Sequence, residues 1–88
     1  MKLEQTILKN LIYNEDYLRK VLPFLKAEYF RERTDRTIYE EIATFTSTYN
    51  SPPTIEALGL AIKERRNLTD HEVSGGESCL QEIESSKS

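Results

Sequence analysis

Apolar residues recur at helical spacing along most of the chain, and the breaks between these stretches predict five helices. The first stretch places its apolar side chains on one helical face, and its members are Leu3, Ile7, Leu8, Leu11 and Ile12. Asn14 is the predicted N-cap of a second helix, which has acidic residues in its first turn. Pro23 should end or kink that helix.

The segment from Pro23 to Phe30 is too apolar for a solvated loop and too short for a long helix. We expect a packed connector there, either irregular or with one helical turn. Thr34 is the predicted N-cap of a third, central helix, whose apolar positions are Ile38, Ile42, Phe45 and Tyr49. The third helix should stop at Asn50 to Pro53, because consecutive prolines lack backbone donors and favour extended conformations before them.

Thr54 is the predicted N-cap of a fourth helix, whose charged end at residues 63–66 should point largely to water. Thr69 and Glu72 have the spacing of a capping box and predict a fifth helix. Its core face would contain Val73, Gly76, Leu80 and Ile83. Gly76 would then permit close helix packing, although Gly75 and Gly76 could instead break the helix in two.

These elements predict an all-α fold, a small orthogonal bundle of about five helices, since no alternating apolar pattern or hairpin turn is present. We assign residues 1–84 to a single helical globular domain. Residues 85–88 contain no apolar anchor, and we interpret them as a frayed tail or as the truncation point of a longer natural chain.

Charge and cysteine content narrow the classes of function. The 88 residues carry a formal net charge of −3, so direct nucleic acid binding should be weak or absent unless a local patch supplies it. Cys79 is the sole cysteine, which excludes an internal disulfide and fits a reducing cytoplasm. No apolar run approaches the roughly 20 residues of a membrane span, and no signal peptide is evident, so we expect no membrane contact and a cytoplasmic location.

Few residues suggest chemistry, and each has a simpler structural explanation. The segment 75–78 is glycine-rich but lacks the lysine and the spacing of a phosphate-binding loop. His71, the one histidine, has acidic neighbours that diverge around a helix, so we expect it to be solvated. The carboxylate pairs should be the solvated faces of helices, and these are Glu40 with Glu41 and Glu82 with Glu84. We therefore predict no catalytic, cofactor-binding or metal-binding residue.

One segment interleaves basic and aromatic residues as nucleic acid surfaces do, and it contains Tyr29, Phe30, Arg31, Arg33 and Arg36. Acidic neighbours dilute its charge, so local salt bridges are the preferred explanation, followed by a protein interface and then by DNA contact. A second basic cluster lies at residues 63–66. The candidate interaction surface that we select consists of Tyr13, Tyr17, Arg31, Arg33, Arg36 and Leu60.

The order of these segments resembles the N-terminal domain of DnaB-type replicative helicases, in the version carried by T-even-like phage helicases. The resemblance covers nearly all of the chain and rests on three segments. They are Glu4-Gln5-Thr6-Ile7-Leu8 followed by Leu11-Ile12, then Tyr29-Phe30 before Arg36-Thr37-Ile38-Tyr39-Glu40-Glu41-Ile42, and Pro53-Thr54-Ile55-Glu56-Ala57-Leu58. Many bacterial members of this family have a glycine pair where this chain has Lys9-Asn10, and a histidine where it has Arg36. These differences favour the phage branch of the family.

The resemblance implies a non-catalytic collar domain of a hexameric, ATP-driven helicase that moves along single-stranded DNA. Its implied partners are the other helicase subunits, primase and the helicase loader, as in a primosome. The motor, with its ATP and magnesium sites, would follow residue 88, as would a helical hairpin that pairs subunits. The fragment itself would then need no cofactor and should be monomeric or weakly associating.

Two other classes of function compete with this interpretation. A stand-alone small helical phage adaptor that binds a host or replication protein would also be all-helical and would end near Ser88. A small helical DNA-binding protein is disfavoured by the acidic charge and by the lack of a basic recognition helix.

Overall fold

The computed structural model describes residues 3–86, which form five α-helices and two short 3-10 turns without a strand. The helices are α1 (Leu3–Tyr13), α2 (Glu15–Val21), α3 (Arg33–Tyr49), α4 (Ile55–Glu64) and α5 (Asp70–Ser85). The 3-10 turns η1 (Leu22–Phe24) and η2 (Ala27–Tyr29) lie between α2 and α3. The predicted all-α bundle is therefore confirmed.

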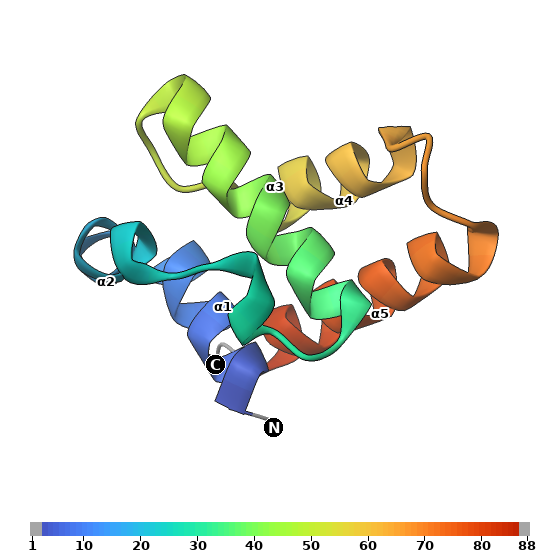
Figure 1. Ribbon diagram of the computed structural model, residues 1–88, viewed down its shortest axis with the longest axis horizontal. Coiled ribbons are helices and arrows are strands. Elements are labelled where there is room, and N and C mark those ends of the chain that lie inside the picture. The colour runs from blue at the N-terminus through green and yellow to red at the C-terminus, as the bar shows by residue number, and fades with distance from the viewer. Residues whose placement is uncertain (1–2, 87–88) are drawn as a thin grey trace.

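Helix α3 crosses the middle of the bundle, and α1, α4 and α5 all pack against it (Figure 1). Their apolar faces form one core, in which the fully buried side chains include Leu8, Leu11, Leu18, Ile38, Ile42, Leu58, Ile62 and Ile83. Burial of this apolar surface is the main force that holds the helices together. None of the described helices is long and apolar enough to cross a membrane.

Side-chain caps start three of the helices, as the sequence predicts. The Asn14 side chain accepts a hydrogen bond from the Tyr17 backbone N–H, and the Thr54 hydroxyl accepts one from Ala57. Thr69 and Glu72 form both bonds of a capping box at the start of α5. Each cap satisfies a backbone donor that has no partner within its helix.

The third helix begins one residue before the predicted cap, so the assignment of Thr34 as N-cap is wrong. Glu32 has extended backbone angles, and its carbonyl accepts the first helical bond from the Arg36 N–H at 3.0 Å. The Arg36 guanidinium also binds the carbonyls of Phe30 and Arg31, at 3.1 and 3.0 Å. These bonds fix the chain just before the helix, which moves the start of α3 to Arg33.

The connector between α2 and α3 contains two 3-10 turns, and its aromatic residues have different environments. Phe30 is buried and stacks on Tyr39, with 5.2 Å between the ring centroids. Phe24 and Tyr29 are instead 78% and 55% exposed, so the expected packing of the whole connector holds only for part of it.

Helix α5 continues through Gly75 and Gly76, and the alternative in which they break the helix is wrong. A Cβ added at Gly76 would lie 3.2 Å from Cδ1 of Ile62 on α4, so the glycine permits the close packing that the sequence predicts. The predicted tail 85–88 overlaps the end of α5. Ser85 is helical and the Ser86 carbonyl accepts a 2.6 Å bond from Lys9 on α1, whereas residues 87–88 lie outside the described range.

Candidate functional site

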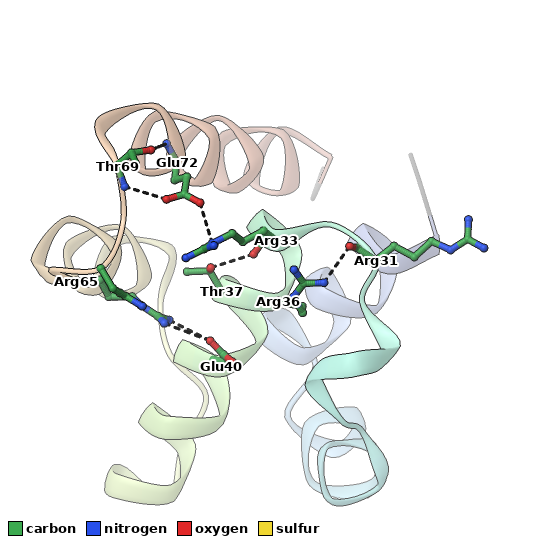
Figure 2. A network of polar contacts seen from close by, with 9 residues as sticks. Arg31, Arg33, Arg36, Thr37, Glu40, Arg65, Thr69 and Glu72 are labelled. Atoms are coloured by element: carbon green, nitrogen blue, oxygen red, sulfur yellow. Dashed lines mark hydrogen bonds and ion pairs between the residues drawn. The ribbon is translucent and has the colours of Figure 1, made fainter.

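The two basic clusters of the sequence meet at one corner of the bundle, where α3 begins, α4 ends and α5 begins (Figure 2). Arg33, Arg36 and Arg65 line a cavity of about 280 Å³ there, together with the carboxylate of Glu40. Residues 33–36 and 65 are far apart in the sequence, so spacing alone could not show that they converge.

Ion pairs occupy two of these arginines. Arg33 Nε lies 2.8 Å from Glu72 Oε2, and Glu72 also accepts the capping bond from the Thr69 N–H at 2.9 Å (Figure 2). That backbone bond, with the Arg33 charge as a smaller contribution, lowers the pKa of Glu72. The pair therefore joins the first turn of α3 to the cap of α5.

Arg65 joins α4 to α3 at the same corner. Its Nη1 lies 3.1 Å from Glu41 Oε2 and 3.3 Å from Glu40 Oε1, and the Arg65 side chain is only 23% exposed. The prediction that Arg65 points to water is thus wrong, because two carboxylates on α3 draw it onto the bundle. Glu41 is likewise only 19% exposed and is no solvated helix face.

The six residues of the candidate interaction surface are spread over the molecule. Arg31 is exposed and its side chain extends away from the polar network (Figure 2). Arg33 and Arg36 both line the cavity that contains Arg65. Tyr17 of α2 packs against the core, whereas Leu60 of α4 is 61% exposed. Tyr13 is half-buried and lines a different cavity.

The cavity at Tyr13 has a volume of about 370 Å³ and lies where α1 and α5 end and α4 begins. Glu56 of α4 and Glu84 of α5 line it with the tyrosine. Burial, and then the nearby charges of Glu84 and Glu56, raise the pKa of Tyr13.

Asp35 is a buried carboxyl that sequence analysis missed. It is 1% exposed, and Cys79 Sγ donates to its Oδ1 across 3.7 Å. Burial, with the Asp35 charge next, raises the pKa of Cys79 to about 12, so the thiol is a poor nucleophile. A signal was present, because Asp35 lies three residues before Ile38 and seven before Ile42, which places it on the apolar face of α3.

His71 is exposed, as predicted. Within residues 3–86 no group of three or more histidine, cysteine, aspartate and glutamate side chains has the arrangement of a metal site.

Comparison with known proteins places this domain in a family. Residues 1–87 match the family described as the DnaB-like helicase N terminal domain. A DnaB-like replicative helicase of Enterobacteria phage T4 is 30% identical over 79 residues, which make up 90% of this chain and 16% of that helicase. The chain thus spans less than a fifth of that relative. The chain belongs to the family of DnaB-like helicase N-terminal domains.

Proposed function

We propose that this domain is the non-catalytic N-terminal collar of a hexameric replicative DNA helicase, where it supports ring assembly and contacts primase or the helicase loader. The observation that carries the proposal is the match of residues 1–87 to the helicase N-terminal domain family. The similarity to a phage replicative helicase over 90% of the chain supports it further.

Exposed side chains suit a role in protein contacts. Phe24 and Tyr49 are 78% and 65% exposed, and Leu60 is 61% exposed, on three different elements of the bundle. Large aromatic and aliphatic side chains of this kind are the usual anchors of protein interfaces. The domain therefore has apolar contact points in several directions.

The charge distribution supports weak or no direct nucleic acid binding. The net charge is −3, and the arginines that interleave with aromatic residues are largely engaged within the chain. Phosphate contacts would have to compete with these internal bonds. ATP and magnesium would be bound by the motor of the parent protein, which would work in the cytoplasm, or in the host cytoplasm if a phage encodes it.

Deletion of residues 1–88 from the full-length gene product tests the proposal. Sedimentation velocity would compare the intact and truncated proteins, and ATPase assays would compare their response to primase and to the loader. We expect the truncated protein to form less hexamer and to lose stimulation by at least one partner. Unchanged assembly together with an unchanged response to both partners would overturn the proposed role.

A further inference from the structure

The connector between α2 and α3 leaves two aromatic side chains uncovered. Phe24 is 78% exposed and Tyr29 is 55% exposed. Even a fully extended backbone would separate their Cα atoms by at most about 17 Å. One short peptide can therefore reach both rings, and exposed aromatic side chains are frequent anchors of protein interfaces.

The backbone beside both rings is fixed to the bundle. The Leu25 carbonyl, directly after Phe24, accepts a bond of 2.9 Å from the Tyr39 hydroxyl of α3. Phe30, directly after Tyr29, is buried and stacks on the ring of the same Tyr39. A partner would thus find the two exposed rings already in place, which reduces the entropy that binding costs.

The same stretch concentrates positive charge in an acidic protein. Residues 19–31 contain four basic side chains and one acidic one, whereas the rest of the chain contains eight basic and fourteen acidic ones. Lys20, Lys26 and Arg31 are exposed and form no ion pair within residues 3–86. The four residues outside that range bring no acidic side chain. These three cations are therefore available to carboxylates of another molecule.

The cations accompany the rings along the connector. Helix α2 runs directly into η1, so Lys20 and Phe24 lie about one helical turn apart and neighbour each other. Lys26 lies between the two rings in the sequence, and the Arg31 side chain extends away from the polar network (Figure 2). We call this set the connector surface, and its members are Lys20, Phe24, Lys26, Tyr29 and Arg31.

We propose that the connector surface binds an acidic segment of a partner protein. Carboxylates of that segment would pair with the three cations, while its aliphatic side chains pack on Phe24 and Tyr29. A basic segment would be repelled, and a purely polar one would leave the rings in water. That the occupant is a protein rests on the proposed function.

A nucleic acid strand would also meet cations and aromatic rings here, but it fits this surface less well. Its phosphates continue past the connector surface, over a domain whose remaining side chains are mostly acidic. A short acidic segment can end where the cations end, and at physiological salt charges more than about 8 Å away are largely screened. The segregation of charge therefore favours the peptide.

Titration of the ¹⁵N-labelled 88-residue chain with acetyl-Asp-Leu-Asp-Asp-Asp-Leu-Asp-amide, followed by NMR, tests the proposal. The two leucines of this peptide lie about 13 Å apart when it is extended, so they can contact both rings. We expect saturable shifts centred on the amides of Phe24, Lys26 and Tyr29. Control peptides with Ser for every Asp, or with Ser for every Leu, should bind at least about fivefold more weakly, because each lacks one kind of contact.

A pair of double variants tests the role of the cations. Lys26→Gln/Arg31→Gln should weaken binding of the acidic peptide about fivefold, since each exposed charge contact contributes modestly. The matched variant Lys63→Gln/Arg66→Gln removes the same charge from exposed sites elsewhere. It should change binding less than about twofold.

A second pair tests the role of the rings. Phe24→Ser/Tyr29→Ser should weaken binding about tenfold, and the exposure of both rings means that the fold does not depend on them. The matched variant Tyr49→Ser/Leu60→Ser removes side chains that are 65% and 61% exposed on other elements, and it should leave binding nearly unchanged.

Equal weakening in a test variant and its matched control would show unspecific attraction and overturn the proposal. Tighter binding of oligothymidylate than of the acidic peptide at the same amides would assign the surface to nucleic acid, and shifts of these amides on concentrating the chain alone would assign it to a second copy; either result would overturn the proposal. The titration is independent of ring assembly. A failed titration beside a confirmed effect of deleting residues 1–88 would remove only the connector surface, whereas the reverse result would remove only the proposed function.

Discussion

Arg65 and Glu41 should contribute more to stability than any exposed ion pair of this domain. Their atoms lie 3.1 Å apart, and their side chains are only 23% and 19% exposed. At this distance an effective dielectric constant of about 20 gives a gross attraction of about 5 kcal/mol, most of which desolvation and lost side-chain freedom offset. We expect a net coupling of about 1.5 kcal/mol, above the roughly 0.2–1 kcal/mol of exposed pairs.

A double-mutant cycle with Arg65→Ala and Glu41→Ala, followed by urea unfolding, measures this coupling. Arg65→Ala alone should destabilise the domain by about 2 kcal/mol and lower Tm by roughly 8–16 °C. The control cycle uses Lys63 and Glu77, which are 3.4 Å apart with side chains 59% and 38% exposed, and should give less than about 0.5 kcal/mol. Equal coupling in the two cycles would refute the argument that burial strengthens the pair at Arg65.

Four further predictions concern α5. At pH 8 alkylation of Cys79 should be roughly a thousandfold slower in the folded chain than in urea, because a thiol of pKa about 12 is almost wholly protonated. Stability should also fall as pH rises from about 9.0 to about 12, since the unfolded thiol ionises first, and a flat pH profile in urea unfolding would contradict this. Gly75→Ala should stabilise the helix by about 0.5–1 kcal/mol, because a Cβ at Gly75 would have ordinary contacts. Gly76→Ala should give no such gain, because a Cβ at Gly76 would lie only 3.2 Å from the Ile62 side chain. Equal effects of the two substitutions in thermal unfolding would contradict the packing argument. NMR titration of the Glu72 carboxyl should give a midpoint below the usual pKa of glutamate, and the stability that this carboxylate contributes should be lost as pH falls through that midpoint. The variant Thr69→Pro removes the backbone N–H that donates to Glu72, so it should return the midpoint toward the usual pKa.

Features that depend on near neighbours could be predicted from the sequence. The caps at Asn14, Thr54 and Thr69 each join residues three positions apart, so the spacing alone indicates them. The stop of α3 follows from Asn50, whose φ of 55° is a left-handed conformation that asparagine tolerates, and from the prolines behind it. The helical spacing of apolar residues also predicted most of the core.

Features that depend on tertiary contacts could not be predicted in this way. The contact of Arg65 with Glu41 joins residues 24 positions apart, and no pattern in the sequence pairs them. The cavity at Tyr13 requires the ends of α1 and α5 to meet the start of α4, which only the packed bundle shows. Phe24 and Phe30 are the same residue type in one connector, yet Phe30 is buried and stacks on the ring of Tyr39, whereas Phe24 is 78% exposed.

The central claim is that this domain is the assembly module of a replicative helicase, and the natural coding sequence after residue 88 tests it most directly. We predict a long helical pair followed by a G-x-x-x-x-G-K-[ST] motif, whose backbone and lysine would hold the phosphates of ATP. A stop codon directly after residue 88 would contradict the claim. The motor would then be absent, and a stand-alone helical adaptor would be the better account of this chain.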